Sequence, residues 1–465
     1  MPLKEFRRLD LNAVEAGVSI HTLMANAGKA LAEAARSDGK VVLLCGKGNN
    51  GGDGFAAAGV LLRWGVDAHV VLLEARKNIG DLPRRFLDLL PDERIHEWGP
   101  DRRAWKDAAV VVDCMLGSGI RGKPRSPYDQ AIRWLNKHAG SKLACDIPSG
   151  LGTGLAVRPD ATVTFHAEKE GMAGASGTIT VADIGIPKRA QGDVGLGDLD
   201  AGFVRPQTGG HKGDHGRVLV IGGGPYAGAP HYAGMGALRA GADLVHLAVP
   251  SPTAATVASW GPDLIVHAVG EGHVAEPDVP RLVAWAEQAD ALVLGPGMGH
   301  ESGSLAAVRE VLDSTEMPVV VDADALRALD ERVLKRHGPR LLLTPHAAEF
   351  KRLANRAPTT SSVAAFADEQ GVVVLAKGAV DLVSDGMTTR SCRRGHPTMT
   401  VGGTGDVLAG VCGALLAKGA DRLDAACAAA YLVGRAGEVA ASLRSYGATA
   451  TDIHEAIPSV LLSLG

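Results

Sequence analysis

The sequence predicts an α/β protein built from two three-layer αβα domains, and three observations predict it. The length of 465 residues suits two domains of roughly 200 to 250 residues each. Short β-branched runs alternate with Ala- and Leu-rich stretches in both halves, and a Gly-, Asp- and Pro-rich stretch interrupts this alternation near the middle. The apolar runs are continuous, as expected of strands buried on both faces of a parallel sheet.

Six apolar runs of the first half are expected to be strands. They are Val41–Cys45, residues 68–73, 109–114 and 142–146, Ala161–Phe165 and residues 178–181. Helices are expected between them, for example over residues 53–64 and 127–137. Strands that alternate with helices in this way form a parallel sheet with helices on both faces.

The alternation stops over residues 185–216, where we expect the linker, with the boundary near residues 203–213. The two domains are therefore expected to span residues 1–205 and 206–465. The pattern then restarts, and helices rich in Ala and Gly are expected from residue 405 to about residue 442. The strands expected in the second half are Arg217–Ile221, residues 243–249, Ala291–Leu294, Val319–Val321, Leu341–Leu343 and residues 372–375.

Composition excludes several classes of protein. The formal net charge of -4 gives no support to a nucleic-acid partner. The chain shows neither a signal-peptide core nor an apolar run of about 18 residues, so we expect no membrane span. The six cysteines show no CxxC spacing, and Cys45, Cys114 and Cys145 lie in or just after apolar runs. We therefore expect no zinc site and a cytoplasmic protein.

The densest motif follows the expected strand Val41–Cys45. It is Gly46-Lys47-Gly48-Asn49-Asn50-Gly51-Gly52-Asp53-Gly54, and a helix is expected after it. Glycines let a backbone approach a ligand closely, and free amides at a helix start attract an anion. The motif also satisfies GxGxxG, and Glu74 ends the next strand, as in a dinucleotide-binding oxidoreductase. The side-chain oxygens of Asn49, Asn50 and Asp53 favour a more specialised pocket.

Two further strand ends carry carboxylates. Asp113 precedes a glycine-rich loop, and Asp146 precedes Ile147-Pro148-Ser149-Gly150. Because adjacent parallel strands end at the same sheet edge, these groups are expected to converge with the Asn50 loop. An aspartate in such a pocket can act as a general base. Alternatively, oxygens of Asn50, Asp113 and Ser149 can cage a hard cation.

Four segments of the first half, GKGNNGGDG, VDCMLGSGIRG, DIPSG and TVTFHAEKEGM, resemble the NAD(P)HX epimerase family over about residues 1–203. The resemblance implies a Rossmann-like domain in which Asp146 is the catalytic acid/base and Asn50, Asp113 and Ser149 bind potassium. It implies that the hydrated cofactor contacts Asp146 and the set Asn49, Asn50, Gly51, Gly52, Asp53, Gly117, Ser118, Gly119, Ile120, Arg121, Gly122 and Lys123.

The second half contains five turns whose residues suit phosphate chemistry. The segments are Gly222-Gly223-Gly224, Gly295-Pro296-Gly297, Asp322-Ala323-Asp324, Thr344-Pro345-His346 and Gly402-Gly403-Thr404-Gly405-Asp406. The last turn precedes an apolar helix, so its amides can stabilise a transferring phosphoryl group while Asp406 takes a proton from an attacking hydroxyl. The chain contains no GxxxxGK[ST] motif of the Walker type.

Seven segments of the second half resemble the NAD(P)HX dehydratase family of the ribokinase-like fold over about residues 211–465. They are HKGDHGRVLVIGGG, ALRAGADLVHLAVP, LGPGMG, VVDADAL, LTPHAAEF, AKGA and GGTGDVLAG. The resemblance implies that the hydrated cofactor contacts Ala237, Gly297, His346 and the catalytic Asp406. It implies that an adenine nucleotide, ADP or ATP with magnesium, contacts Lys377, Gly378, Ala379, Val380, Asp381 and Gly405.

Together the two resemblances imply an enzyme that repairs hydrated nicotinamide cofactors. It would epimerise the R and S forms of NADHX and NADPHX and dehydrate the S epimer at the expense of ADP or ATP, and we expect a homo-oligomer. Three alternatives stay open at this point. They are a ribokinase-like small-molecule kinase fused to a nicotinamide dinucleotide-binding domain, an oxidoreductase in the first half, and a chain in which one domain serves as a binding scaffold.

Overall fold

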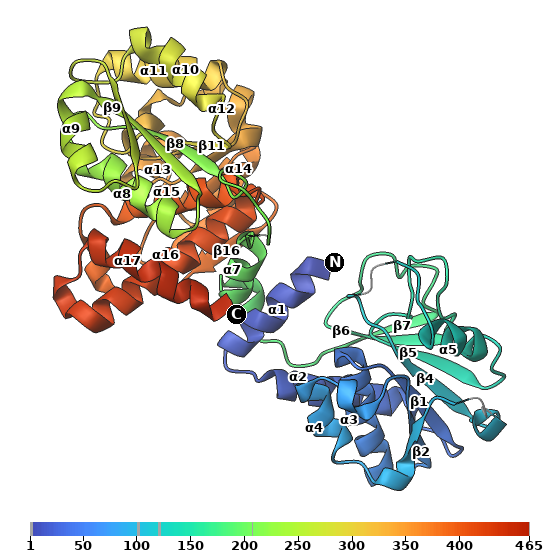
Figure 1. Ribbon diagram of the computed structural model, residues 1–465. Coiled ribbons are helices and arrows are strands. Elements are labelled where there is room, and N and C mark those ends of the chain that lie inside the picture. Colours follow the sequence, from blue (N-terminus) through green and yellow to red (C-terminus); the bar gives the residue numbers. More distant parts are fainter. Residues whose placement is uncertain (1–2, 100–102, 120–121, 207, 465) are drawn as a thin grey trace. The chain divides into compact units, whose positions relative to one another are not determined.

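A computed structural model describes residues 3–99, 103–119, 122–206 and 208–464. The chain divides into two compact units, Met1–Ala190 and Gln191–Gly465 (Figure 1). The stretch expected to be a linker contains two short helices, α6 (Lys188–Gly192) and α7 (Leu196–Gly202). Helix α7 packs closely on α16 (Arg422–Arg444), because a Cβ atom on Gly202 would lie 2.4 Å from the Asp424 carbonyl oxygen.

The first unit contains a parallel sheet of seven strands in the order β3-β2-β1-β4-β5-β6-β7. The chain crosses over between β3 and β4, so β1 and β4 are neighbours and the carboxyl ends of these two strands form a topological switch point. The strands are β1 (Val41–Cys45), β2 (Ala68–Leu72), β3 (Ile95–Glu97), β4 (Val110–Cys114), β5 (Ser141–Cys145), β6 (Ala161–Phe165) and β7 (Thr178–Ala182).

The central strand β1 is buried on both faces because its alternate side chains enter different cores. Val41 and Leu43 join a cluster with helices α2 and α3, whereas Val42 and Leu44 join a cluster with α5 (Figure 1). This explains the continuous apolar run of the sequence. The α-helices of the unit are α1 (Leu3–Glu15), α2 (Ile20–Ala35), α3 (Asn49–Arg63), α4 (Asp81–Leu87), α5 (Tyr128–Leu135) and α6. Short 3-10 turns span Arg76–Asn78, Asp92–Arg94 and Arg103–Trp105.

The second unit contains a nine-stranded mixed sheet in the order β10-β9-β8-β11-β12-β13-β14-β15-β16. The seven strands up to β14 run parallel, and β15 and β16 are added antiparallel at one edge. The strands are β8 (Arg217–Ile221), β9 (Leu244–Pro250), β10 (Ile265–Val269), β11 (Ala291–Leu294), β12 (Val319–Val321), β13 (Leu341–Leu343), β14 (Val373–Ala376), β15 (Asp381–Ser384) and β16 (Thr389–Cys392).

Helices cover both faces of this second sheet as well. Val218 and Val220 of β8 face a core with α8, α15, α16 and α17, whereas Leu219 and Ile221 face a core with α10, α11, α13 and α14. The remaining helices are α8 (Gly228–Arg239), α9 (Ser251–Ser259), α10 (Val279–Ala286), α11 (Ser302–Asp313), α12 (Glu331–His337), α13 (Ala347–Ala354), α14 (Thr360–Gln370), α15 (Thr404–Ala417) and α17 (Ala450–Leu461). Further 3-10 turns span Glu276–Asp278, Ala323–Ala328, Gly338–Arg340, Pro397–Thr400, Ser445–Gly447 and Leu462–Leu464.

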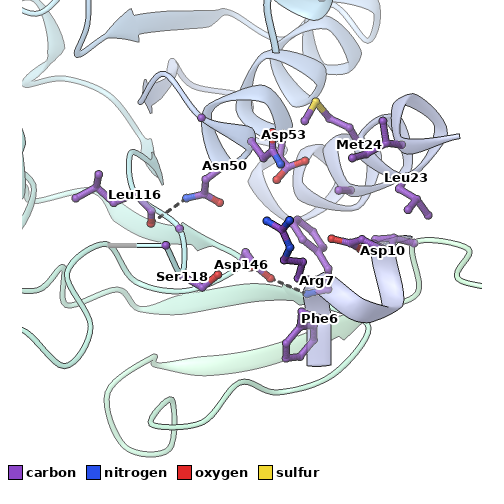
Figure 2. Close-up of a pocket in the computed structure, with 18 of the residues that line it drawn as sticks. Phe6, Arg7, Asp10, Leu23, Met24, Asn50, Asp53, Leu116, Ser118 and Asp146 are labelled. Carbon is purple, nitrogen blue, oxygen red and sulfur yellow. Dashed lines mark hydrogen bonds between the residues drawn. The ribbon is translucent and has the colours of Figure 1, made fainter. Parts of the chain in front are cut away.

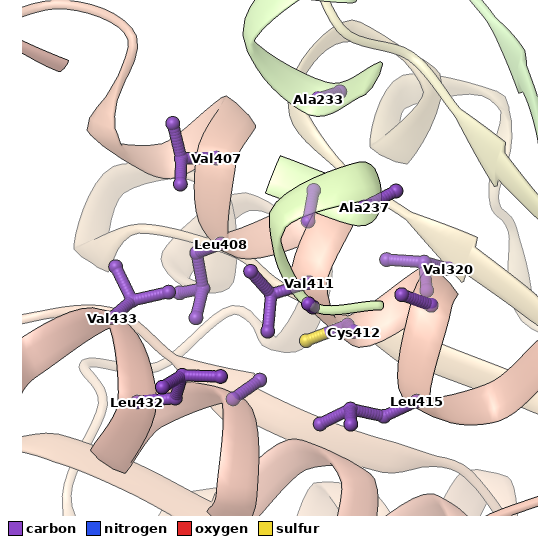
Figure 3. Packing of buried hydrophobic residues seen from close by; sticks show 14 of the residues in the cluster. Ala233, Ala237, Val320, Val407, Leu408, Val411, Cys412, Leu415, Leu432 and Val433 are labelled. Atoms are coloured by element: carbon purple, nitrogen blue, oxygen red, sulfur yellow. The ribbon is translucent and has the colours of Figure 1, made fainter. Parts of the chain in front are cut away.

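Helices α8 and α15 pack at unusually short range (Figure 3). A Cβ atom on Gly410 would lie 1.8 Å from the Ala233 carbonyl oxygen, and one on Gly236 would lie 2.4 Å from the Val407 carbonyl oxygen. The two backbones therefore approach each other where glycine has no side chain. This packing fixes the start of α15, which carries Asp406, against the sheet.

The predicted strands and the α/β class are confirmed, and both sheets have the expected helical layers on their two faces. Four strands were not anticipated: the edge strands β3, β10 and β16, and β15, which lies next to β16. All four are partly exposed, so their sequences lack the long apolar runs of the central strands. Among the residues that the structure describes, no helix is both long and apolar enough to cross a membrane. All six cysteines are free and buried.

Candidate functional site

The asparagine- and glycine-rich motif of the first unit lies mostly in a helix. We expected the helix after this motif to begin at residue 53, but helix α3 begins at Asn49, so the turn is limited to residues 46–48. The glycines inside the helix serve close packing. A Cβ atom on Gly51 would lie 1.9 Å from the Gly46 carbonyl oxygen, and one on Gly54 would lie 2.7 Å from the Cys45 sulfur. Glycine at these positions lets α3 start directly above the carboxyl end of β1.

A cavity of about 1020 Å³ opens at this edge of the first sheet. Figure 2 shows that Asn50 and Asp53 from α3, Asp146 from the end of β5 and Asp10 from α1 line the same space. The volume suits a nucleotide-sized ligand. Its wall combines carboxyl groups with apolar side chains from α1 and α2, including Phe6, Leu23 and Met24.

A hydrogen-bond network joins Asn50 to the two residues predicted to share a cation with it. Asn50 Nδ2 donates a 3.2 Å hydrogen bond to the Leu116 carbonyl oxygen. The Leu116 amide donates a 2.8 Å bond to Ser149 Oγ, which in turn donates a 2.5 Å bond to Asp113 Oδ1. The Ser149 amide donates a 2.7 Å bond to Asp113 Oδ2. The structure therefore brings Asn50, Asp113 and Ser149 together around Leu116.

One oxygen of this network lacks a partner. Asn50 Oδ1 is buried and accepts no hydrogen bond, although buried polar atoms are normally paired. Burial raises the pKa of Asp113 to about 6, against the opposing effect of its hydrogen bonds from Ser149 and Met115. An unpaired carbonyl oxygen beside a desolvated carboxyl is a donor set that suits a monovalent or other hard cation. Within the described ranges, no cluster of three His, Cys, Asp or Glu side chains is placed to hold a metal ion.

The predicted catalytic residue Asp146 has a strained backbone. Its φ angle is 64°, in the left-handed region that non-glycine residues rarely adopt. His166, at the end of the neighbouring strand β6, has φ of 68° and lines the same cavity. Strain of this kind gathers at functional sites, where the surrounding structure holds it. The Asp146 amide donates a 2.8 Å hydrogen bond to the Val163 carbonyl oxygen, which fixes the turn.

Asp146 forms an ion pair that the sequence did not lead us to expect. The Lys169 ammonium group donates a hydrogen bond to Asp146 Oδ1 and is itself buried, with its side chain 3% exposed. The Phe165 amide donates a further 3.2 Å bond to the same oxygen. Lys169 follows the end of β6 and is 23 residues from Asp146 in the sequence, so no local motif predicts the pair.

Carboxyl groups crowd this part of the cavity. Burial raises the pKa of Asp53 well above its usual value, and the charges of Asp146 and Asp10 raise it further. Burial, together with the charge of Asp146, raises the pKa of Asp10 to about 6. Lys169 lowers both values, but its ammonium group is hydrogen-bonded to Asp146. A group of this kind carries a proton near neutral pH and is typical of acid–base sites.

The residues predicted for the first site fall into three groups. Those that line the cavity are Asn49, Asn50, Asp53, Gly117, Ser118, Gly119 and Asp146. Those outside its lining are the packing residues Gly51 and Gly52, the network residues Asp113 and Ser149, and the exposed Gly122 and Lys123. Ile120 and Arg121 lie outside the described residues. Sequence reasoning missed Phe6, Arg7, Asp10 and Lys169, which line the cavity from α1 and from the segment after β6.

In the second unit, loops from three neighbouring strands meet at the carboxyl edge of the sheet. A Cβ atom on Gly295 would lie 1.9 Å from the Asp322 carbonyl oxygen, and one on Gly297 would lie 2.5 Å from the Tyr226 carbonyl oxygen. The Gly299 amide donates a 2.8 Å hydrogen bond to Asp324 Oδ2. Gly297 has φ of 66°, so a residue with a side chain would be strained here as well as crowded.

The centre of the second site is a buried ion pair. Lys377 Nζ donates a 2.7 Å hydrogen bond to Asp322 Oδ1, and Thr344 Oγ1 donates a 2.8 Å bond to the same oxygen. A Cβ atom on Gly405 would lie 3.2 Å from Lys377 Nζ, so the ammonium group lies against the glycine turn that starts α15. Although burial opposes its charge, Asp322 and neighbouring carboxylates raise the pKa of Lys377 above its ordinary value.

The Asp406 side chain completes this arrangement. Burial and, to a smaller extent, the charge of Asp322 raise its pKa to about 7, against the opposing charge of Lys377. Such a carboxyl exchanges protons near neutral pH, as a general base requires. His346 lies beside the group, because its backbone pairs with that of Lys377, and its side chain is 56% exposed. His346 Nδ1 accepts hydrogen bonds from the amides of Ala348 and Glu349, so the ring caps α13.

Of the residues predicted for the second site, Lys377, Gly405, Asp406 and His346 come together, and Gly297 belongs to the adjoining loops. Gly378 and Ala379 are exposed in the turn after Lys377, and Val380 is half-buried beyond them. Asp381 accepts a 2.8 Å hydrogen bond from the Gly378 amide and thereby closes that turn. The Ala237 side chain is different: it is fully buried in the core between α8 and α15 (Figure 3).

Comparison with known families agrees with both resemblances. A family profile described as NAD(P)H-hydrate dehydratase matches residues 218–459, and one described as YjeF-related protein N-terminus matches residues 20–171. A curated protein of Methanothermobacter thermautotrophicus, named bifunctional NAD(P)H-hydrate repair enzyme, is 39% identical over 97% of this chain and 93% of its own. A protein of the same name from Archaeoglobus fulgidus is 38% identical over 99% of this chain and 98% of its own.

Solved structures resemble part of the chain. A ribokinase-like superfamily protein from Enterococcus faecalis superposes with a TM-score of 0.52 at 22% identity, over 58% of this chain and 94% of its own. A hypothetic protein from Streptococcus mutans gives a TM-score of 0.51 at 25% identity, over 57% of this chain and 97% of its own. These likenesses support the ribokinase-like fold predicted for the second half.

Proposed function

The chain belongs to the family of bifunctional NAD(P)H-hydrate repair enzymes, and we propose that it carries both activities of that name on its two separate sites. The site of the first unit would interconvert the R and S epimers of hydrated NADH and NADPH. The site of the second unit would dehydrate the S epimer at the expense of ADP or ATP. This membership favours repair over the sugar-kinase, oxidoreductase and scaffold alternatives.

The observation that carries the proposal is that each unit holds an acidic, buried site of its own at the carboxyl edge of its sheet. In the first, Asp146 is held by Lys169 in a cavity of about 1020 Å³. In the second, Asp406 lies beside Lys377 at a glycine turn. Two reactions on one damaged cofactor require two sites, because a single pocket cannot be complementary to both transition states.

Epimerisation requires reversible proton transfer to and from the hydroxyl group on the ring carbon whose configuration changes. That carbon also carries the ring nitrogen, so protonation of the hydroxyl lets it leave as water. Asp146 lines the cavity, where a carboxyl oxygen can exchange a proton with the hydroxyl group of the hydrated ring. The contacts proposed for the hydrated cofactor include Asn49, Asn50, Asp53, Gly117, Ser118, Gly119 and Asp146, all of which line the cavity.

Potassium is proposed as the cation of the first site. Asn50 Oδ1 lacks a partner, and oxygens of Asp113 and Ser149 lie in the same network, so these three residues would hold it. When bound, the ion would offset the charge of Asp113 and orient Asn50. Asn50 also has a structural role. Its Nδ2 donates a hydrogen bond to the Leu116 carbonyl oxygen, and this bond positions the loop of Gly117 to Gly119 at the cavity.

Dehydration would proceed through phosphorylation of the ring hydroxyl. Asp406 takes the hydroxyl proton, and the oxygen attacks the terminal phosphorus of the nucleotide. The bond from that phosphorus to the bridging oxygen breaks, so AMP leaves when ADP is used and ADP leaves when ATP is used. Amides of the glycine turn and the Lys377 ammonium group stabilise the developing charge. Phosphate then leaves from the ring carbon while the adjacent carbon loses a proton, which restores the ring double bond. The nucleotide contacts proposed are Lys377, Gly378, Ala379, Val380, Asp381 and Gly405.

Magnesium is proposed to accompany the nucleotide. Mg²⁺ bound with nucleotide phosphates usually needs one or two protein carboxylates and keeps several waters. We propose Glu349 for this role because its charge interacts with both Lys377 and Asp322. Its Oε2 accepts a 2.8 Å hydrogen bond from the His346 amide, which holds the carboxylate at this edge of the sheet. We further propose that the protein works in the cytoplasm as a homo-oligomer.

The proposal is tested by incubating the protein with hydrated NADH, ADP or ATP and magnesium, and following the absorbance of reduced nicotinamide. The wild-type protein should recover all of the hydrate. Asp406→Asn should abolish recovery. Asp146→Asn should recover the S fraction quickly and the rest at the rate of spontaneous epimerisation. Full recovery by Asp406→Asn, or a single fast phase with Asp146→Asn, would show that these residues do not have the proposed roles.

A further inference from the structure

The Lys169 ammonium group has no hydrogen left for a substrate. It donates hydrogen bonds to Asp146 Oδ1, to Thr164 Oγ1 at 2.9 Å and to the Phe165 carbonyl oxygen at 2.8 Å. An ammonium ion has three hydrogens, so all three are committed. The Phe6 ring of α1 covers the group, with Lys169 Nζ 4.3 Å from the ring centre in a cation–π contact. Lys169 therefore acts on Asp146 and not on a bound ligand.

The geometry also separates Asp53 from Asp146. Asp146 accepts a hydrogen bond directly from the Lys169 ammonium group, whereas Asp53 forms no ion pair with any residue that the structure describes; it lies in the first turns of α3, with 9% of its surface exposed. The charged groups that line the same cavity are Lys4, Arg7 and Asp10 from α1, Lys47, Glu74, Asp146 and Lys169. Burial and the charges of Asp146 and Asp10 raise the pKa of Asp53, and Lys169 opposes them.

Two carboxyls in one cavity, one paired with a cation and one buried beside other carboxyls, take different protonation states. Resting on the proposed epimerisation, we propose that Lys169 is a positioning residue that keeps Asp146 charged and aimed into the cavity, and that Asp53 is the second catalytic carboxyl, which holds the proton. Asp146 then serves as the base of the reaction and Asp53 as its acid.

Epimerisation proceeds by loss of water from the ring carbon and its return to the opposite face. The Asp53 proton passes to the hydroxyl oxygen of the hydrated ring, the carbon–oxygen bond breaks, and water leaves. The lone pair of the ring nitrogen forms a carbon–nitrogen double bond. Water then adds to the opposite face of the same carbon while Asp146 takes its proton. The proton returns from Asp146 to Asp53 before the next turnover, and the reverse reaction uses the two carboxyls in exchanged roles.

The role of Lys169 is tested with Lys169→Met, which keeps an unbranched side chain one atom shorter and removes its charge. We expect kcat for epimerisation to fall by about 100-fold or more, the effect of losing a positioned acid–base group. We expect KM for hydrated NADH to change little, because Lys169 has no hydrogen left to donate to the ligand.

Two further variants keep this test decisive. Thr164→Val removes one acceptor of the Lys169 ammonium group and should lower kcat by a smaller factor with KM little changed, even if Lys169→Met folds poorly. Lys29→Met removes a lysine from the exposed face of α2 and should leave kcat and KM unchanged. If Lys169→Met and Thr164→Val both keep the wild-type kcat, Lys169 does not position Asp146.

The role of Asp53 is tested by Asp53→Asn and by infrared spectroscopy, which does not depend on turnover. At neutral pH the wild-type spectrum minus that of Asp53→Asn should contain one carboxylic-acid carbonyl band, and epimerisation should fall by about 100-fold. A carboxylate band in place of the acid band would overturn the assignment. If the wild-type protein epimerises nothing while the acid band is present, the proposed function fails and the assignment of the proton to Asp53 stands.

Discussion

Lys377 Nζ donates a 2.7 Å hydrogen bond to Oδ1 of the almost completely buried Asp322, and this pair aims a positive charge at the glycine turn before α15. Thr344 Oγ1 donates to the same Asp322 oxygen at 2.8 Å. Asp322 thus links the end of β12 to the end of β14 below the proposed phosphate site. The Lys377–Asp322 pair should therefore affect both the stability of the second unit and the rate of dehydration, and the two effects can be measured separately.

Asp322→Asn should damage the second unit more than loss of a neutral hydrogen bond would. It leaves the Lys377 charge buried without its partner, which typically costs about 3–5 kcal/mol of unfolding free energy. Thr344→Val, the matched control, removes one neutral donor to the same oxygen and should cost about 1 kcal/mol. Denaturant unfolding of both variants gives the comparison. Equal, small losses would mean that Lys377 finds another partner.

The pH dependence of dehydration should follow Asp406. Because its pKa is raised to about 7, the carboxyl is protonated below that pH and cannot accept the hydroxyl proton. We expect kcat/KM for dehydration to fall about tenfold per pH unit below about 7. Rates measured with the S epimer between pH 5 and pH 9 test this. A rate that stays flat down to pH 5 would exclude a base with this pKa.

The same shift predicts how stability changes with pH. A carboxyl whose pKa is raised by folding binds its proton more tightly in the folded state, so its contribution to stability is complete below the unfolded value of 3.8 and is lost as the pH rises through about 7. Asp406→Asn removes this penalty and should therefore raise Tm relative to the wild-type protein more at pH 8 than at pH 5. An equal change of Tm at both pH values would contradict the shift.

The glycine at the start of α3 should tolerate no side chain. In Gly51→Ala the new Cβ atom would lie 1.9 Å from the Gly46 carbonyl oxygen, whereas in Gly48→Ala it would meet nothing within 4 Å. Overpacking typically costs about 1–3 kcal/mol, so Gly51→Ala should destabilise the first unit and impair epimerisation, with dehydration retained. Thermal unfolding of the two variants provides the comparison. Similar stabilities would mean that α3 shifts freely.

Potassium should affect the first site through Asn50. If the unpaired Asn50 Oδ1 accepts a cation, potassium should accelerate epimerisation and raise the Tm of the first unit, since a ligand that binds the folded state stabilises it. Asn50→Ala should lose both responses. Titrations with potassium chloride, with tetramethylammonium chloride to keep the ionic strength equal, measure them. A response that persists in Asn50→Ala would place the cation elsewhere.

The buried central strands could be predicted from the sequence almost to the residue, because a strand covered on both faces must be apolar throughout. The edge strands β3, β10 and β16 could not, since partial exposure relaxes that requirement. The start of α3 was placed too late, because glycines inside residues 49–54 were attributed to a turn. They are needed instead for contact with β1, β4 and α2, a tertiary requirement that has no local signature.

The candidate sites were predicted where a motif marks a strand end and missed where the partner comes from elsewhere. Asp146 and Asp406 follow recognisable glycine-containing turns. Lys169 and Asp10 do not, because one reaches back from the segment after β6 and the other comes from the N-terminal helix. A lysine close after a strand end was the signal that the sequence offered for Lys169. Its partner could be identified only from the fold.

The central claim, that one chain holds two independent sites for two steps of one repair, is tested most directly by mixing variants. Asp146→Asn and Asp406→Asn, each alone with hydrated NADH, magnesium and ADP, should leave hydrate unrepaired on the time scale of the wild-type reaction. An equimolar mixture should restore complete repair, because each variant retains the site that the other lacks and the epimers diffuse between molecules. A mixture that repairs no more than Asp146→Asn alone would contradict the account.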